Sequence, residues 1–313
     1  MAARAVAAWA PVLGLIPKPC KPPGLSAIVR VKDEETWLEP CIRSIATVAD
    51  EVIVGDNGST DRSLEILRRL ELELGGVLRL FECGEVGIKQ LSNHLLEQTQ
   101  FRWVIRWDAD FVAHTEGPQS IQILRDWLDE LDERRYYMVY PRMVELAGDL
   151  SHQRPLTSTR ADCHCFTSSE AVRYVYGPSG FEAPKIPISY GACRFEVPTF
   201  FHVDVKPDRR MFLSHVWKEY LLAVDRADYE TFEAYINHTL QQEWRSMEVD
   251  EAAQAWAADH FRGLVRYDEE RFGAYPALLQ PHLEKPRFRI QYAAGQISGR
   301  AEADPGNSDS GLN

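Results

Sequence analysis

Short apolar runs alternate with helix-like stretches through the first half of the chain. Four runs are mostly apolar and have the length of strands buried on both faces, and they cover residues 25–31, 51–55, 77–81 and 103–107. Three intervening stretches repeat apolar residues at helical spacing, and they cover residues 37–45, 64–70 and 91–97. Strands separated by helices form right-handed βαβ units. We therefore predict an α/β fold with a mostly parallel central sheet flanked by helices.

The second half of the chain has a less regular pattern. Residues 119–133 form an amphipathic helical pattern, residues 136–140 predict a further strand, and from Met211 onward the pattern is helical and aromatic. We divide the chain into a proline-rich lead-in over 1–24, two halves of one α/β domain over 25–115 and 116–212, a helical appendage over 213–297, and a tail over 298–313. The tail has almost no apolar residues, so we expect it to be disordered.

Composition narrows the possible function classes. The 313 residues carry a formal net charge of −12, which argues against nucleic-acid binding, because such proteins present a basic face. The six cysteines are scattered except for Cys163 and Cys165 beside His164, which favours a reducing compartment over a disulfide framework. The apolar stretch over residues 5–16 is too short and too interrupted for a spanning helix or a signal peptide. We expect a cytoplasmic protein with no integral membrane segment.

Two carboxylates, Asp108 and Asp110, stand where the fourth apolar run ends. Carboxylates this close repel each other at neutral pH, and a hard divalent cation with oxygen ligands relieves the repulsion. Mn²⁺ and Mg²⁺ commonly take one or two protein carboxylates and complete their shell with water and phosphate oxygens. The pair is therefore a candidate anchor for a metal-bound diphosphate. The alternative is a strand end that carries two solvated acids.

Polar residues also follow the first two apolar runs. Residues 31–35 are Val-Lys-Asp-Glu-Glu, and residues 56–61 are Asp-Asn-Gly-Ser-Thr-Asp. Ligands of parallel sheets bind beyond the carboxyl ends of the strands, so these residues and Asp108 are placed to share one ligand. Taken singly, residues 56–58 form only a helix-capping turn, and Glu34 is a favourable acid in the first turn of a helix. The chain has no Gly-x-Gly-x-x-Gly or Gly-Lys-Ser/Thr motif, which argues against a dinucleotide site or a phosphate-binding loop.

In their order and spacing, these three motifs resemble those of the family 2 glycosyltransferases. The match covers residues 25–115, and the Lys-Asp-Glu-Glu form of the first motif resembles a branch with bacterial lipopolysaccharide-core and peptide-glycosylating enzymes. The resemblance implies the GT-A fold, a Rossmann-like domain whose first half binds a nucleotide-sugar and whose second half, residues 116–212, binds the acceptor. It also implies that Asp56 accepts a hydrogen bond from the base and that residues 30–32 line the base pocket.

The same resemblance assigns donor binding to residues at all three strand ends. The Asp-Ala-Asp motif would hold the ribose and the metal-bound diphosphate. The family often has an arginine before the fourth strand, but residues 91–93 are Leu-Ser-Asn here, so Lys89 or Arg106 is its expected substitute. The full set of expected donor-binding residues is Arg30, Val31, Lys32, Glu34, Asp56, Gly58, Lys89, Asn93, Asp108, Ala109 and Asp110.

The catalytic base is expected from the second half of the chain. Transfer by single displacement needs a carboxylate that takes the acceptor proton as the sugar carbon is attacked. Residues 180–182 are Gly-Phe-Glu and resemble the Gly-Phe-Asp/Glu motif of the family, so Glu182 is the expected base. Its distance from the metal motif is shorter than usual, which keeps Glu196 and Asp204 as alternatives. A surface acid in a loop is the plain alternative for Glu182.

His202 resembles the histidine that follows the acceptor region in this branch of the family. Near a diphosphate it would bind the metal together with Asp108 and Asp110, or it would neutralise the leaving group. A lone histidine is otherwise more often structural. The basic stretch over residues 206–210 offers phosphate contacts or is ordinary solvated charge.

Together these features predict a metal-dependent, inverting glycosyltransferase with Mn²⁺ or Mg²⁺ as its cofactor. The expected donor is a UDP-sugar, and the acceptor is an unidentified saccharide, peptide or small molecule. One alternative is a haloacid dehalogenase-like phosphohydrolase, whose Asp-x-Asp motif is also fitted by Asp108 and Asp110. That motif normally lies on the first strand, whereas this one follows the fourth. Another alternative is a non-catalytic relative that binds sugar nucleotides.

Overall fold

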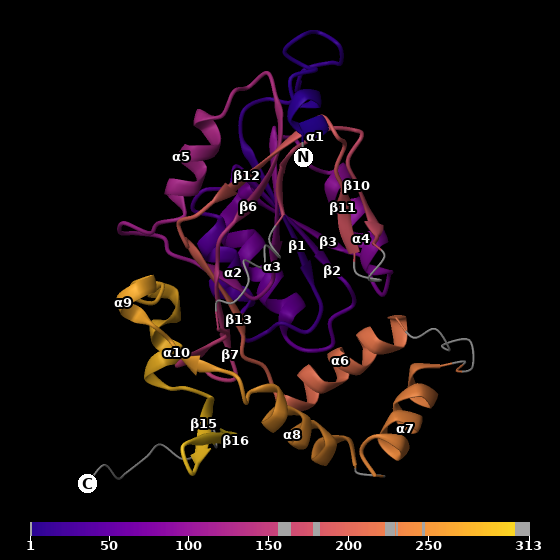
Figure 1. Cartoon of the computed structure of the whole chain (residues 1–313), viewed down its shortest axis with the longest axis vertical. Coiled ribbons are helices and arrows are strands. Elements are labelled where there is room, and N and C mark those ends of the chain that lie inside the picture. The colour runs from indigo at the N-terminus through magenta and orange to yellow at the C-terminus, as the bar shows by residue number, and fades with distance from the viewer. Residues whose placement is uncertain are drawn as a thin grey trace.

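A seven-stranded sheet forms the centre of the computed structural model (Figure 1). The structure describes residues 2–155, 164–177, 182–222, 229, 231–245 and 248–303. In spatial order the strands are β12 (Tyr190–Phe195), β6 (Tyr136–Pro141), β9 (Cys165–Thr167), β4 (Trp103–Asp108), β1 (Leu25–Val31), β2 (Glu51–Asp56) and β3 (Leu78–Glu82). β1 pairs in parallel with β2 and β4, β2 with β3, and β6 with β12, whereas β9 runs antiparallel to both its neighbours. The predicted α/β class with a mostly parallel sheet is confirmed.

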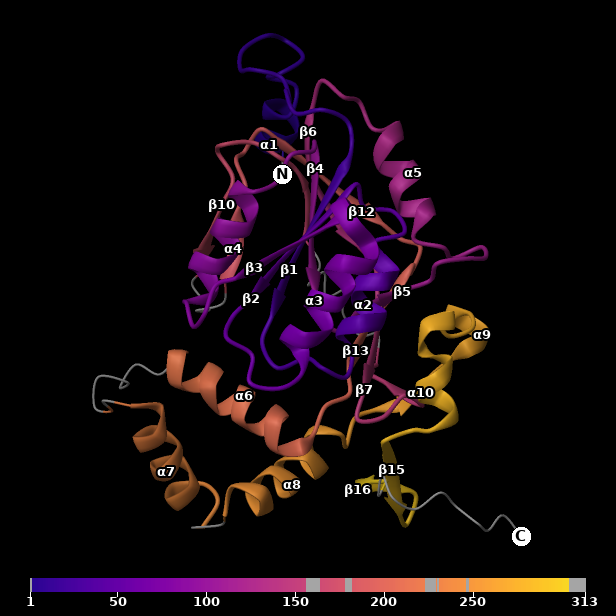
Figure 2. The ribbon, with the colours of Figure 1, turned by 180° about the vertical axis from the view of Figure 1, so that it is seen from behind.

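Helices cover both faces of this sheet (Figure 2). They are α2 (Leu38–Ile45), α3 (Ser63–Leu74), α4 (Ile88–Glu97) and α5 (Gln122–Glu130), with the 3-10 turn η1 (Gly75–Val77) after α3. The apolar stripes of α2, α3 and α5 share a core with Val29 and Ile105, whereas that of α4 packs on the other face against Ile28 and Val104. Successive strand residues point to opposite faces, and both faces are buried, which is why these strands are apolar throughout.

A second sheet of five strands continues from the carboxyl end of β4. In spatial order its strands are β14 (Val265–Arg266), β8 (His152–Gln153), β7 (Val144–Ala147), β13 (Phe200–Asp204) and β5 (Phe111–Ala113). β13 pairs with β5, and His202 stands opposite Phe111, so this histidine lies beside the segment that follows Asp108. A separate hairpin, β10 (Arg173–Tyr176) and β11 (Glu182–Lys185), packs against α4.

The C-terminal region is mainly helical and ends in a hairpin (Figure 1). Its helices are α6 (Asp208–Leu222), α7 (Phe232–Gln242), α8 (Val249–His260), α9 (Glu269–Phe272) and α10 (Gln280–Glu284), with the 3-10 turn η3 (Ala277–Leu279). The hairpin is β15 (Phe288–Ala293) and β16 (Gln296–Glu302). The segment boundaries proposed from the sequence stay predictions.

The sequence-based prediction places the start of the disordered tail, residue 298, too early in the chain. β16 occupies residues 298–302, inside the stretch predicted to be disordered. The reason is Arg300, whose side chain is only 1% exposed. It forms an ion pair with Asp208 and donates a hydrogen bond to the Gly148 carbonyl at 2.7 Å. Contacts with distant residues thus order a polar strand that has few apolar residues of its own. Residues 304–313 lie outside the described residues.

The lengths of the helices bear on the expectation that the protein has no integral membrane segment. The lead-in contains a short helix, α1 (Ala2–Ala7). Within the ranges that the structure describes, no helix is both long enough and apolar enough to cross a membrane.

Candidate active site

The carboxyl ends of β1, β2 and β4 bring the three sequence motifs together. In the parallel pairing, Val31 stands beside Asp56, and Arg30 stands beside Asp108. β1 lies between the other two strands, so Asp56 and Asp108 flank its end from opposite sides. The motifs therefore meet at the edge of a parallel sheet where ligands usually bind.

Asp56 uses one carboxylate oxygen to build the turn after β2. Its Oδ2 atom accepts hydrogen bonds from the backbone amides of Gly58 at 3.0 Å and Ser59 at 3.1 Å. Gly58 has a φ of 75°, which glycine adopts without strain. The Oδ1 atom of Asp56 is buried and has no hydrogen-bond partner among the described residues. A buried acceptor without a partner is costly, so this oxygen is suited to a hydrogen bond from a ligand.

Lys32 contacts the same turn. Its ammonium donates to the Gly58 carbonyl at 2.7 Å and to Glu85 Oε1 at 2.9 Å, and its side chain is 39% exposed. The preceding side chain, Val31, is buried in the core that α2 and α3 cover. Lys32 therefore keeps a charged group at the mouth of the turn, whereas the side chain of Val31 contributes through packing.

Asp108 has an arginine on each carboxylate oxygen. Arg30 Nη2 lies 3.1 Å from Oδ1, and Arg106 Nη2 lies 3.1 Å from Oδ2. Burial raises the pKa of the Asp108 carboxyl, but the guanidinium groups of Arg106 and Arg30 outweigh burial and lower the pKa below its ordinary value. Asp108 is therefore ionised at neutral pH and holds two positive charges at the end of β1. The adjacent Ala109 is buried.

Asp110 is paired with cations from the segment that contains β13. Lys206 Nζ lies 2.6 Å from its Oδ2 atom, and His202 Nε2 lies 3.4 Å from the same oxygen. Burial opposes ionisation of the Asp110 carboxyl, but Lys206 and His202 hold its pKa well below the usual range. For His202, burial lowers the pKa and Asp110 raises it, with a net pKa of about 9. With these neighbours His202 is protonated at neutral pH.

Glu34 shares Lys206 with Asp110. Lys206 Nζ lies 2.8 Å from Glu34 Oε1, and Arg210 Nη2 lies 2.7 Å from the same oxygen. Arg210 also donates to the Lys32 carbonyl at 2.8 Å, which ties α6 to the end of β1. The sequence favours Glu34 as a donor contact and shows Lys206 only as part of a basic stretch. Their pairing is invisible in the sequence because 172 positions separate them.

Glu182 reaches the site from β11. Its Oε2 atom lies 2.6 Å from Arg30 Nη1, and its side chain is 5% exposed. The other oxygen, Oε1, is buried and has no hydrogen-bond partner in the described part of the chain. Since Arg30 also holds Asp108, one guanidinium joins the expected base to the Asp-Ala-Asp motif. Residues 180 and 181, which complete the Gly-Phe-Glu motif, lie outside the described residues.

The two alternative bases occupy different positions. Glu196 is exposed directly after β12, at the edge of the central sheet. Asp204 ends β13, where Arg154 Nη2 lies 3.6 Å away, and its charge contributes to the raised pKa of His202. Of the three carboxylates, Glu182 is the one that an ion pair ties to the residues around Asp108.

The comparison with known families agrees with this geometry. Residues 26–145 match the family described as glycosyl transferase family 2. Over these residues the chain is similar to the family 2 glycosyltransferases. The matched range includes Asp56 at the end of β2 and Asp108 and Asp110 at and after the end of β4, and it favours glycosyl transfer over the phosphohydrolase alternative.

One curated protein and two solved structures illustrate what the chain is similar to. An uncharacterized glycosyltransferase from Rickettsia bellii is 30% identical over 100 residues, which are 32% of this chain and 32% of that protein. The match thus spans about a third of the length of that relative. A mannosyltransferase from Pyrobaculum calidifontis, solved with GDP-Man and Mn²⁺, has a TM-score of 0.46 at 16% identity over 82% of this chain and 83% of its own. Residues 1–349 of S. aureus TarS give 0.41 at 12% identity over 71% and 73%.

Two of the residues that the sequence places in the donor site contact strand β10 of the β10–β11 hairpin. Asn93 Nδ2 donates to the Tyr174 carbonyl at 3.0 Å, and Asn93 Oδ1 accepts from the Tyr174 amide at 2.8 Å. The ammonium of Lys89 lies 5.2 Å from the centre of the Tyr176 ring. Both residues therefore hold β10, and their donor contacts stay predictions. Arg106, the other substitute for the missing arginine, lies at Asp108.

The side-chain oxygens and nitrogens around Asp110 are chemically suited to a divalent cation. Asp108, Asp110 and His202 offer carboxylate oxygens and an imidazole nitrogen, and His202 Nε2 already lies 3.4 Å from Asp110. Among the residues with described positions, no group of three or more His, Cys, Asp or Glu is arranged to hold a metal ion. A metal ion whose coordination shell consists of two carboxylates and diphosphate oxygens needs no such group. Both carboxylates already have cationic partners, because the oxygens of Asp108 are paired with Arg30 and Arg106, and Asp110 Oδ2 is paired with Lys206.

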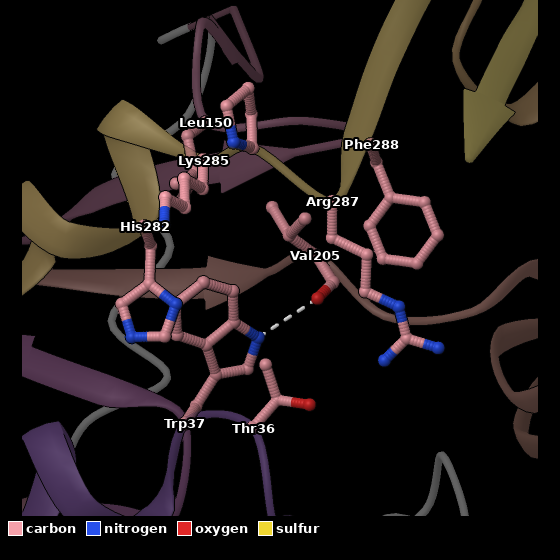
Figure 3. A pocket seen from close by; sticks show the side chains of 9 residues that line it. Thr36, Trp37, Leu150, Val205, His282, Lys285, Arg287 and Phe288 are labelled. Atoms are coloured by element: carbon pink, nitrogen blue, oxygen red, sulfur yellow. Dashed lines mark hydrogen bonds between the residues drawn. The ribbon is translucent and has the colours of Figure 1, made fainter. Parts of the chain in front are cut away.

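A small cavity of about 40 Å³ borders the segments that carry Glu34 and Lys206 (Figure 3). Trp37 Nε1 donates to the Val205 carbonyl at 2.8 Å, and the rings of Trp37 and His282 lie 4.7 Å apart. Trp37 closely follows Glu34 in the chain, and Val205 directly precedes Lys206. The indole hydrogen bond therefore fixes these two segments relative to each other. The cavity itself has room for only a few water molecules.

Proposed function

We propose that this protein is a glycosyltransferase that transfers a sugar from a UDP-sugar donor to an acceptor. The observation that carries the proposal is the arrangement of Asp56, Asp108 and Glu182 around the end of β1. Asp56 offers a hydrogen-bond acceptor for the nucleobase, and Asp108 lies among fixed positive charges suited to a diphosphate. Glu182 offers a carboxylate that can take the proton of the acceptor substrate. Charge stabilisation of the leaving group and a general base are what glycosyl transfer by single displacement requires, and the contact with the nucleobase would position the donor.

Donor binding would use the turn after β2 and the strand ends beside it. The Oδ1 atom of Asp56, which has no partner among the described residues, would accept a hydrogen bond from a nucleobase N–H, and uracil has such a donor at N3. Lys32, which is partly exposed at the mouth of the turn, would move between Glu85 and the bound nucleotide. Arg30 and Arg106 would supply positive charge near the diphosphate, because both already lie at Asp108.

A divalent cation, Mn²⁺ or Mg²⁺, is proposed to be held by Asp108, Asp110 and His202. When bound, it supplies Lewis-acid stabilisation of the leaving diphosphate. His202 has to release its proton to become a ligand, and its pKa of about 9 comes largely from the neighbouring Asp110. In its protonated form the same imidazolium would instead neutralise the leaving group directly.

Glu182 is the proposed base. Its unpartnered Oε1 atom would take the proton of the acceptor while Oε2 stays on Arg30. Direct attack of the acceptor on the sugar carbon inverts the anomeric configuration. Glu196 and Asp204 stay as alternative bases. The acceptor is proposed to be a saccharide, a peptide or a small molecule bound by residues 116–212.

A donor screen tests this function. Purified protein would be incubated with a panel of nucleotide-sugars, with Mn²⁺ or with EDTA, and nucleotide release would be measured. We expect release from a UDP-sugar that requires metal, followed by a mass shift of the acceptor when acceptors are screened with that donor. Binding of UDP-sugars without any release would indicate a non-catalytic relative. A retained anomeric configuration in the product, measured by NMR, would contradict single displacement.

A further inference from the structure

Lys206 is a largely buried lysine between two carboxylates. Its side chain is 17% exposed, and its Nζ atom lies 2.6 Å from Asp110 Oδ2 and 2.8 Å from Glu34 Oε1. A buried ammonium is stable only when it is paired, and both carboxylates contribute to that pairing here. Lys206 is therefore a built-in cation of the proposed donor site.

The backbone around Lys206 is held from several directions. Trp37 donates to the carbonyl of Val205, and Arg300 Nη2 donates to the carbonyl of Lys206 at 2.6 Å (Figure 3 shows the first contact). Arg210 holds the other partner, Glu34, from α6. Because the backbone is fixed at both sides, any rearrangement of the Lys206 ammonium has to come from its flexible side chain. Since the ammonium already contacts both carboxylates, it can leave Asp110 and stay on Glu34 when that side chain rotates.

The contact with Asp110 involves the oxygen that a metal ion would need. Asp110 Oδ2 lies near both Lys206 Nζ and His202 Nε2, so an ion held between Asp110 and His202 would compete with the ammonium for the same oxygen. A metal ion at that oxygen would be strongly repelled by the ammonium, which lies closer to the oxygen than the His202 ring does. We propose that Lys206 is a resident counter-ion of Asp110 that a divalent cation has to displace, and that Glu34 is the positioning residue that receives the displaced ammonium. This inference rests on the proposed metal site of the glycosyltransferase.

The first test measures Mn²⁺ binding to the nucleotide-free protein by electron paramagnetic resonance of free Mn²⁺. Lys206→Met removes the competing charge and keeps a side chain of similar length. We expect Mn²⁺ to bind about tenfold more tightly or better, because a neighbouring charge changes the affinity of a carboxylate for a proton by about one to three orders of magnitude. Lys218→Met, an exposed lysine on α6, is the matched control and should leave Mn²⁺ affinity unchanged. Unchanged or weaker binding in Lys206→Met would overturn the proposal.

The second test uses a variant with the opposite expected sign. Glu34→Gln removes the charge that draws Lys206 away from Asp110, so the ammonium should stay on Asp110 and Mn²⁺ should bind more weakly. Simple damage to the site would weaken Mn²⁺ binding in both variants. Tighter Mn²⁺ binding in Lys206→Met together with weaker binding in Glu34→Gln would therefore indicate cation exchange and not damage. Glu34 also attracts Mn²⁺ directly, and this attraction acts whether or not Lys206 is present. The effect of Glu34→Gln must therefore be smaller in the Lys206→Met background, and an equal effect in both backgrounds would overturn the role of Glu34.

Failure of this inference is distinguishable from failure of the proposed function. Mn²⁺ binding is measured without nucleotide, whereas the function is tested by nucleotide release from a UDP-sugar. Tighter Mn²⁺ binding in Lys206→Met together with no nucleotide release by the wild-type protein would uphold the cation exchange and contradict the glycosyltransferase. Metal-dependent nucleotide release by the wild-type protein with unchanged Mn²⁺ affinity in Lys206→Met would uphold the glycosyltransferase and contradict the cation exchange.

Discussion

Arg30 Nη1 lies 2.6 Å from Glu182 Oε2, although 152 positions separate these residues in the chain. The same guanidinium lies 3.1 Å from Asp108 Oδ1, and its side chain is 13% exposed. A guanidinium presents its donors in a rigid planar fork, so it fixes the separation of the two carboxylates that it joins. One buried cation thereby sets the distance between the proposed base and the proposed metal motif.

Replacing Arg30 by lysine should slow transfer more than it weakens donor binding. The lysine keeps the charge, but its single ammonium cannot span Glu182 and Asp108 as the fork does. We expect kcat to fall about a hundredfold, as misplacement by an ångström or so typically causes, with a smaller change in KM for the UDP-sugar. Steady-state kinetics measure both constants. A kcat equal to that of the wild-type protein would show that the link between the two carboxylates is unimportant.

Glu182→Gln should bind the donor normally but lose sugar transfer. The amide has nearly the shape of the carboxylate, yet it cannot accept the acceptor proton. General base catalysis contributes about 10² to 10⁴ in rate, and a loss of that size is expected. Calorimetric titration with the UDP-sugar and a transfer assay separate the two effects. Glu196→Gln and Asp204→Asn serve as matched variants, and loss of transfer in one of them with an active Glu182→Gln would move the base to that residue.

Asp110→Ala should remove turnover and leave the fold intact. Loss of a charge-stabilising group at the diphosphate costs about 3 kcal/mol or more of transition-state stabilisation. The variant would also lose the dependence of donor binding on Mn²⁺, which calorimetry with and without EDTA detects. Asp259→Ala is the control, because the Asp259 side chain is 72% exposed on α8. Full activity in Asp110→Ala would exclude this motif from the mechanism.

His114 should make the protein less stable in acid. The residue is 7% exposed, and burial lowers its pKa from 6.5 to about 4. The folded protein therefore resists protonation that the unfolded chain accepts, so stability is full above pH 6.5 and is lost as the pH falls towards 4. The difference of 2.5 between the two pKa values corresponds to roughly 3 kcal/mol. Urea unfolding at both pH values should show a smaller loss in His114→Phe, and an equal loss would contradict the assignment.

Arg300→Leu should destabilise the C-terminal hairpin. Asp208, which is 19% exposed at its side chain, would lose its buried partner. Removing one member of a buried ion pair costs about 3 to 5 kcal/mol, because the other charge stays buried without compensation. Thermal unfolding measures the loss, and hydrogen exchange should place it in β15 and β16. The double variant Arg300→Leu and Asp208→Leu should recover part of this stability, whereas further destabilisation would argue against the ion pair as the cause.

The sequence alone determines strands β1 to β4 and β6 of the central sheet and the residues at its carboxyl edge, whereas β9 and β12 are not predicted. Strands buried on both faces have to be apolar throughout, and the helices between them need a repeating apolar stripe, so both patterns are local and visible in the chain. Parallel pairing then places the ends of neighbouring strands at one edge, which is why Asp56 and Asp108 could be predicted to lie close together.

Only the tertiary structure decides which charges meet at that edge. Glu182 joins Arg30, and Lys206 joins Glu34 and Asp110, across separations that no local pattern encodes. The ordering of β16 by Arg300 has the same origin. Ion pairs of this kind depend on where the folded chain brings side chains together, and the residue types that form them are also the most common residues of solvated surfaces. A basic residue in the sequence therefore does not show whether it will face water or a buried carboxylate.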